Sequence, residues 1–149
     1  MIPCSPAGSP RIRLVIDVAV VVGAGTIGAM TALAALAGGA SRVILADVIG
    51  EKLALFAGNP AVTTVNVREQ RLAEVVRDVT TGWGADVVFE ASGNAKVYDE
   101  LFDLLCPGGC AVLVGMPVDR VPLDVAAARL GGARDLTLQG NLDPALLFA

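Results

Sequence analysis

Hydrophobic residues in the first third of the chain fall into runs separated by glycine. The first run, Leu14–Val22, is rich in Val and Ile without polar alternation, which is typical of a parallel strand buried on both faces. After Gly23–Gly25 comes Ile27–Ala37, whose Ala, Leu and Met residues favour a helix that ends at Gly38-Gly39. A further apolar run, Val43–Ala46, follows almost at once. This part of the sequence therefore predicts a strand, a helix and a second strand.

The same alternation continues along the rest of the chain. Apolar residues repeat at helical spacing between residues 72 and 79, and again between 97 and 105, before the turn residues Pro107-Gly108-Gly109. The further elements that we expect are a short helix at Glu51–Ala57, a strand at Val62–Val67, a helix at Leu72–Val79, a strand at Asp86–Ala91, a helix at Val97–Leu105, a strand at Ala111–Val114, a weak helix at Val125–Leu130 and a strand at Leu136–Gln139. Strands that alternate with helices predict an α/β fold, a doubly wound parallel sheet with right-handed crossovers.

The length of the chain fits one domain. Its 149 residues leave little room for a second folded unit. Residues 1–13 are rich in Pro, Ser and Gly and are expected to form an irregular leader, without the basic cluster and apolar core of a secretory signal. Residues 14–149 are expected to form the folded domain.

Composition narrows the class of protein. Hydrophobic residues make up 54% of the chain and charged residues 17%, which argues against disorder. A net charge of −4 without basic clusters argues against nucleic-acid binding. The uncharged stretch from Val18 to Ser41 is long enough to cross a membrane, but five glycines break it into a short and a longer run. We therefore expect a soluble, cytoplasmic protein.

The cysteines indicate neither a disulfide framework nor a metal site. There are three of them, Cys4, Cys106 and Cys110, and the chain contains no histidine. A zinc site would have to combine all three with a carboxylate, whereas zinc sites normally draw on closely spaced Cys and His pairs. We expect reduced thiols.

One motif carries chemistry. Gly23, Gly25 and Gly28 match G-x-G-x-x-G directly after the first strand and at the start of the first helix, and Asp47 follows Gly28 by 19 residues at the end of the second strand. This combination is the fingerprint of a Rossmann dinucleotide-binding domain. The first glycine permits the sharp turn, the second lets a pyrophosphate approach the backbone, and the third allows close packing of the helix.

Two further features specify the expected ligand. Unpaired N–H groups near Thr26, Ile27 and Gly28 are expected to point at the phosphates, where the helix dipole favours an anion. Asp47 can accept hydrogen bonds from ribose hydroxyls, whereas a 2′-phosphate would meet like charge, so we predict NAD rather than NADP. Lys52 could lie beside the same ribose or be merely solvated. The alternative is a glycine-rich turn that binds no ligand.

Four segments resemble one family, the zinc-dependent medium-chain dehydrogenases, in particular the branch of xylitol (D-xylulose reductase) and sorbitol dehydrogenases. They are VVGAGTIG, RVILADV followed by EKL, GWGADVVFEASG and CPGGCAVLVGMP, and the resemblance covers about residues 18–116. It implies an NAD(H)-binding Rossmann domain of a polyol dehydrogenase. The residues that it implies for the cofactor site are Gly23, Gly25, Thr26, Ile27, Gly28, Asp47, Val48, Lys52, Ala91, Ser92, Gly93, Val114, Gly115 and Met116, with the last three beside the nicotinamide.

The sequence also departs from this family. Members carry a catalytic domain with Cys, His and Glu ligands for zinc, and nothing of that kind is found here. We therefore expect no catalytic or metal-binding residue and a fragment that cannot catalyse alone. Two alternatives stay open: a stand-alone NAD(H)-binding or sensing module that works with a partner chain, and an unliganded remnant of the fold. The strand at Leu136–Gln139 is expected at the sheet edge, where it could form a homodimer.

Overall fold

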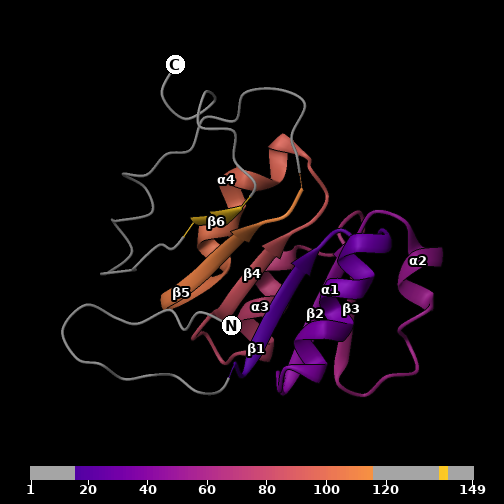
Figure 1. The fold of residues 1–149 in the computed structure, drawn as a ribbon, viewed down its shortest axis with the longest axis horizontal. Coiled ribbons are helices and arrows are strands. Elements are labelled where there is room, and N and C mark those ends of the chain that lie inside the picture. The colour runs from indigo at the N-terminus through magenta and orange to yellow at the C-terminus, as the bar shows by residue number, and fades with distance from the viewer. Residues whose placement is uncertain (1–15, 116–137, 141–149) are drawn as a thin grey trace.

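The computed structural model describes residues 16–115 and 138–140. Within them, helices alternate with strands (Figure 1). The elements are β1 (Val18–Val22), α1 (Thr26–Ala37), β2 (Arg42–Asp47), α2 (Gly50–Ala54), β3 (Val62–Asn66), α3 (Leu72–Val79), β4 (Ala85–Glu90), α4 (Tyr98–Leu101), β5 (Leu105–Leu113) and β6 (Leu138–Gly140). The leader at residues 1–13, Cys4, Met116 and the expected helix at Val125–Leu130 lie outside the described residues.

The described strands form one parallel sheet in the order β3-β2-β1-β4-β5-β6. The chain builds outward from β1 in one direction and then restarts beside it with β4, so the order reverses between these two strands. This is the strand order of the doubly wound Rossmann fold, and it confirms the predicted fold class. The loops that follow β1 and β4 lie at the carboxyl ends of the two strands between which the order reverses, which is where such sheets bind their ligands.

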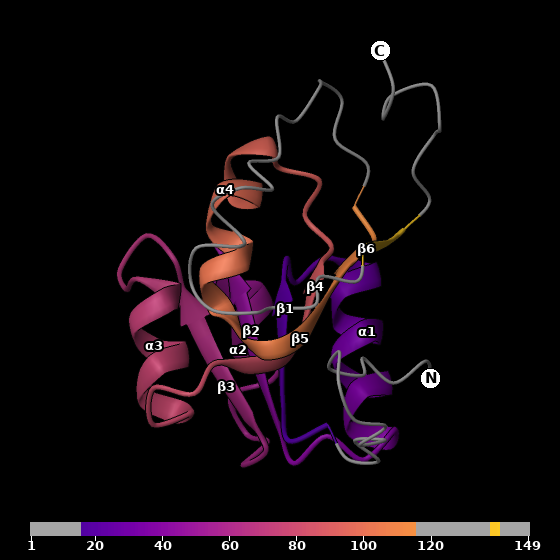
Figure 2. The same ribbon diagram turned by 90° about the vertical axis from the view of Figure 1, so that its left-hand side faces the viewer.

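Both faces of the sheet are covered. Alternate residues of β1 point to opposite faces, so Ala19 and Val21 enter one hydrophobic cluster while Val20 and Val22 enter the other. The first cluster includes residues of α1 and α2, and the second includes residues of α3 and α4. Figure 2 shows α1 on one side of the sheet, opposite α3 and α4. Burial on both faces explains why β1 is an unbroken apolar run.

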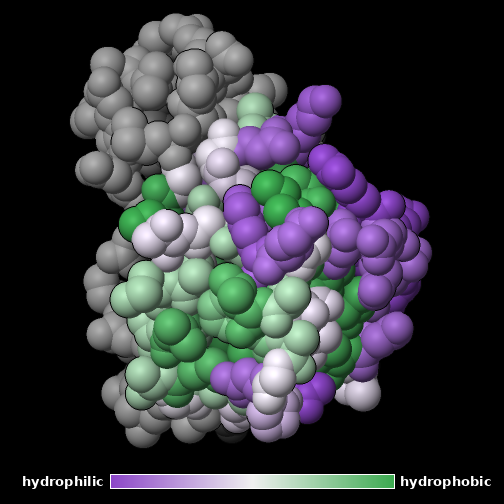
Figure 3. Space-filling view, turned by 90° about the vertical axis from the view of Figure 1, so that its right-hand side faces the viewer, coloured by the Kyte–Doolittle hydropathy of each residue, from purple (hydrophilic) through white to green (hydrophobic). Residues whose placement is uncertain are grey.

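Helix α1 turns its small side chains toward the sheet. Gly28, Ala32 and Ala35 are buried, whereas the large residues at Ile27, Met30 and Leu33 are exposed. Figure 3 shows a broad hydrophobic area on the face of the molecule that carries α1. The small residues let the helix lie close to the strands, and the large ones leave apolar surface on its outer side.

The region between β4 and β5 differs from the prediction. A helix was expected over Val97–Leu105, but α4 has only four residues between two short 3₁₀ turns, and Leu105 already belongs to β5. Leu105 pairs with Ala85, whereas the next paired positions are Cys110 and Val87. Strand β5 therefore carries extra residues in a bulge, and Pro107-Gly108-Gly109 lies in this bulge instead of ending a helix. Bulges are where strands accept Pro and Gly.

Other element boundaries differ by a few residues. Helix α2 ends at Ala54 and not at Ala57, because the chain continues in turn-type hydrogen bonds, from Phe56 N–H to the Leu53 carbonyl and from Ala57 N–H to the Ala54 carbonyl. Strand β1 begins at Val18, later than expected.

In the described parts of the chain, no helix is both long and apolar enough to cross a membrane.

Candidate dinucleotide-binding site

The three motif glycines differ in what a side chain would meet at each position. Gly23 adopts a positive φ of 102°, and a Cβ there would lie 2.9 Å from the backbone nitrogen of Ser92. A Cβ on Gly28 would overlap the carbonyl oxygen of Gly23, so the helix can approach the turn only at glycine. By contrast, a Cβ on Gly25 would have no atom within 4 Å. Gly23 and Gly28 therefore shape the turn, while Gly25 faces open space where a pyrophosphate would fit.

The start of α1 offers donors to an anion. The first hydrogen bond within the helix runs from the Ala29 N–H to the carbonyl of Gly25, at 2.8 Å. The N–H groups of Thr26, Ile27 and Gly28 therefore have no acceptor within the helix. Because the positive end of the helix dipole adds to these donors, the turn can hold phosphate oxygens.

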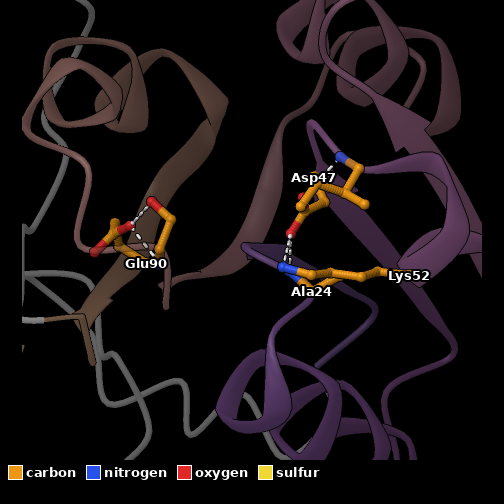
Figure 4. Close-up of polar contacts among 6 residues, drawn as sticks. Ala24, Asp47, Lys52 and Glu90 are labelled. Atoms are coloured by element: carbon orange, nitrogen blue, oxygen red, sulfur yellow. Dashed lines mark hydrogen bonds and ion pairs between the residues drawn. The ribbon is translucent and has the colours of Figure 1, made fainter.

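Asp47 ends β2 beside this turn. Its Oδ2 accepts a hydrogen bond from the Ala24 N–H at 2.7 Å, and its Oδ1 accepts one from the Ile49 N–H at 2.8 Å (Figure 4). The ammonium group of Lys52 lies 3.9 Å from Oδ2, with 41% of its side chain exposed against 9% for Asp47. An ionised carboxylate has about four acceptor positions, so two remain for ribose hydroxyls.

Sequence reasoning missed a hollow beside Asp47. It has a volume of about 660 Å³ and lies where β2 and β3 end. Its lining residues are Val48, Ile49, Gly50, Glu51, Ala54, Asn66, Arg68 and Glu69. Of these, only Val48 was predicted as a site residue. The signal available was topological: the residues after β3 follow a strand that pairs with β2, so its end meets the end of β2 at the same sheet edge.

The loops after β4 and β5 come together on the other side of β1. The Ala91 N–H donates to the Val22 carbonyl at 2.8 Å, which places the Ala91–Gly93 loop against the glycine turn. Val114 and Gly115 donate their N–H groups to the carbonyl of Glu90 at 2.8 and 2.7 Å. The predicted residues after the two strands therefore form one connected surface.

Glu90 is the residue that sequence reasoning overlooked at this point. Its side chain is fully buried, and its carboxylate accepts hydrogen bonds from Ser92, Gly93 and the hydroxyl of Tyr98 (Figure 4 shows part of this group). Burial, together with the charge and the hydrogen bond of Glu90, raises the pKa of Tyr98 above its ordinary value.

The predicted site residues are thus brought to one edge of the sheet, apart from Met116, which lies outside the described residues. Within the described part of the chain, no three His, Cys, Asp or Glu side chains gather in a way that could hold a metal ion. Cys106 and Cys110 are buried and form no disulfide. In the described residues the glycine turn and Asp47 thus lie side by side, joined by the hydrogen bond at Ala24.

Comparisons with known proteins agree with this geometry. The sequence profile of the zinc-binding dehydrogenase family matches residues 26–142. An Agrobacterium fabrum relative named "Putative D-xylulose reductase" is 54% identical over 109 residues, which cover 73% of this chain and 31% of the relative.

Solved structures share the fold. The alcohol dehydrogenase TADH from Thermus sp. ATN1 superposes with a TM-score of 0.76 at 30% identity, over 90% of this chain and 38% of that protein. A Sinorhizobium meliloti 1021 protein solved with NADP bound gives a TM-score of 0.70 at 27% identity, over 87% and 38% of the two chains. The present chain thus spans about a third of the length of the relatives that it matches. With a family match over most of its length and a Rossmann sheet that carries the glycine motif, the chain belongs to the zinc-binding dehydrogenase family.

Proposed function

We propose that this chain is the NAD(H)-binding domain of a polyol dehydrogenase of the D-xylulose reductase type. The observation that carries the proposal is the direct hydrogen bond between Asp47 and the glycine turn at Ala24. It brings the acid that would bind a ribose next to the donors that would bind a pyrophosphate. The identity to the Agrobacterium relative, named "Putative D-xylulose reductase", supports the substrate class.

The two halves of the sheet suggest how the dinucleotide would lie. Each half of a Rossmann sheet receives one mononucleotide. The adenosine would occupy the hollow beside Asp47, and the pyrophosphate would cross the turn at Gly25. The nicotinamide half would meet Ala91, Ser92, Gly93, Val114 and Gly115. A bound nicotinamide supplies hydride chemistry, and the protein's part is to bind and orient it.

Asp47 also bears on the choice between NAD and NADP. A 2′-phosphate would place roughly two negative charges close to the carboxylate of Asp47, whose side chain is largely buried. Lys52 offsets part of that charge, but more than a third of its side chain is exposed and screened by water. We therefore favour NAD, although one structural neighbour was solved with NADP.

Homology favours a dehydrogenase domain over a stand-alone sensing module. The family is that of zinc-binding dehydrogenases, the Agrobacterium relative is named as a reductase and the Thermus neighbour as an alcohol dehydrogenase. Substrate oxidation and zinc binding by the whole protein are part of the proposal. The described residues place no ligand set for the metal, so no step of the reaction is assigned to them.

Titration of the purified chain with NADH, followed by the change in nicotinamide fluorescence, tests the proposal. We expect saturable binding of one NADH per chain and weaker binding of NADPH. Absence of saturable NADH binding by a folded chain would overturn the proposed function.

A further inference from the structure

A second acid ends a central strand in the same way as Asp47, but it faces inward. Glu90 is the last residue of β4, next to β1 where the strand order reverses. Among the described residues it is the one charged residue that is buried, with 0% of its surface exposed. A buried carboxylate is costly unless hydrogen bonds replace its water, so its retention calls for a physical reason.

The carboxylate of Glu90 is surrounded by donors. Its Oε1 accepts hydrogen bonds from the Ser92 N–H at 2.8 Å, from the Ser92 hydroxyl and from the Gly93 N–H at 3.0 Å. Its Oε2 accepts from the Tyr98 hydroxyl at 3.1 Å and from the Gly93 N–H at 3.2 Å. No described Lys or Arg forms an ion pair with it. An ionised carboxylate, which only accepts, matches this set of donors.

The same residue also fixes the loop after β5. Its backbone carbonyl accepts the N–H groups of both Val114 and Gly115, and Tyr98 donates to the Gly115 carbonyl at 3.4 Å. A Cβ on Gly115 would overlap Glu90 Oε2 and the nitrogen of Gly93. The two loops therefore touch each other directly over the Glu90 side chain.

From this arrangement we infer that Glu90 is a positioning residue for the nicotinamide half of the cofactor. The inference rests on the proposed function, because only a bound dinucleotide would use the surface that Glu90 organises. Its carboxylate accepts hydrogen bonds from the backbone of the Ala91–Gly93 loop. Its backbone carbonyl accepts the N–H groups of Val114 and Gly115. The hydrogen bonds of the Asp47 carboxylate, in the half that would bind the adenosine and pyrophosphate, run to Ala24 and Ile49 and not to this group.

A comparison of two ligands separates positioning from general stability. ADP contains the adenosine and the pyrophosphate but no nicotinamide riboside, so it probes only the half of the site around Asp47. In Glu90→Gln, one acceptor oxygen becomes an NH₂ group that faces the donors of Gly93 and Tyr98. We expect NADH affinity to fall about tenfold, the effect of losing one charge-assisted hydrogen bond. We expect ADP affinity to stay within about twofold.

The matched control is Glu74→Gln, the same chemical change on the exposed surface of α3, where Glu74 pairs with the exposed Arg71. It is expected to leave both affinities unchanged. Tyr98→Phe, which removes one donor to Glu90, should weaken NADH binding about threefold without affecting ADP. If Glu90→Gln does not fold, as judged by its thermal unfolding, Tyr98→Phe decides the question by the same comparison.

Each outcome has a distinct meaning. A loss confined to NADH supports the inference. If the unmutated chain binds NADH, but the variants lose NADH and ADP equally or lose neither, the inference is wrong and the proposed function stands. If the unmutated folded chain binds ADP but not NADH, or neither, the proposed function itself fails.

Discussion

Asp47 Oδ2 lies 2.7 Å from the backbone nitrogen of Ala24, so the acid at the end of β2 accepts a hydrogen bond from the middle of the glycine turn after β1. Asp47 therefore holds the turn at Ala24, and in the proposed complex its remaining acceptor positions would bind a ribose. A substitution at this residue should alter both stability and cofactor choice.

The first prediction concerns Asp47→Ala. Two backbone N–H groups, those of Ala24 and Ile49, lose their acceptor, and the free energy of unfolding should fall by about 1–3 kcal/mol. The unmutated chain should bind NADH about tenfold more tightly than NADPH, because like charges repel at the 2′-position, and the variant should narrow that ratio. Fluorescence titrations with both cofactors measure it.

Asp78→Ala provides the control, since this exposed aspartate of α3 lies on another element and should change neither quantity. Equal affinities for NADH and NADPH in the unmutated chain would contradict the role assigned to Asp47.

A second prediction compares two glycines of the motif. Gly25→Ala adds a methyl group with no neighbour within 4 Å at a φ of −70°, so the stability of the fold should be little changed. NADH affinity should fall at least about tenfold, because the methyl group would occupy the position of the pyrophosphate. Gly28→Ala forces a Cβ into the Gly23 carbonyl and should destabilise the fold by about 3 kcal/mol or more. Urea unfolding and NADH titration of both variants provide the measurements.

The pair is informative because the two changes are chemically identical. If Gly25→Ala binds NADH as the unmutated chain does, the pyrophosphate does not cross this turn. If Gly28→Ala is as stable as the unmutated chain, the close contact between α1 and the turn does not limit stability.

The third prediction is a pH dependence. The pKa of Tyr98 is raised in the folded protein, first by burial and then by Glu90, so above the ordinary tyrosine value of about 10 the unfolded chain releases a proton that the folded chain keeps. Stability should therefore be unaffected by this group below about pH 10 and should fall as the pH rises further. Tyr98→Phe should flatten that fall.

Tyr98 is the one tyrosine of the chain, so the tyrosinate absorbance reports on it alone. The absorbance should rise only together with unfolding. Ionisation of the folded protein with a midpoint near pH 10 would rule out the buried hydrogen bond to Glu90.

A fourth prediction concerns the edge of the sheet. Strand β6 is the last strand of the sheet among the described residues and pairs with β5. We expect its outer backbone groups to pair with a second copy about a two-fold axis. We expect light scattering to give the mass of a dimer. Gln139→Pro, which removes an N–H from this short strand, should shift the chain toward the monomer, whereas Gln139→Thr, which keeps the N–H, should not. A monomer at high concentration, or a proline variant that dimerises equally well, would refute edge pairing.

The first βαβ unit could be predicted closely, apart from the start of β1, because local rules decide it. A β-branched run buried on both faces, a glycine turn and a run of helix formers agree with one another from Val18 to Asp47. The failure at Val97–Leu105 has a tertiary cause. Leu105 fits a helical repeat, but pairing with Ala85 draws it into β5, and the bulge then absorbs the Pro-Gly-Gly segment.

The site residues likewise fall into those that local sequence predicts and those that tertiary structure places. The glycine turn and Asp47 have a spacing that can be recognised in the sequence, whereas Asn66 and Arg68 reach the hollow only through the pairing of β2 with β3. Glu90 could have been suspected, because VVFE ends on an acid after a buried run just as VILAD does. Nothing in that pattern says that its carboxylate turns inward to Tyr98, since the partner comes from the following helix.

The position of β1 has a consequence for the order in which the domain can fold. Val22 pairs with Ala46 on one side and with Glu90 on the other, so one edge of β1 stays open until the chain has continued far beyond its first βαβ unit. Parallel pairing over such a separation is slow, because the loop must close before any contact is gained. Until β4 has been synthesised and has paired with β1, Ala19–Val22 is an apolar strand with an unpaired edge. Such segments aggregate by pairing with strands of other chains. A nascent chain of this protein is therefore most vulnerable to aggregation before Glu90 has been added, and a product that ends before β4 would keep that vulnerability permanently.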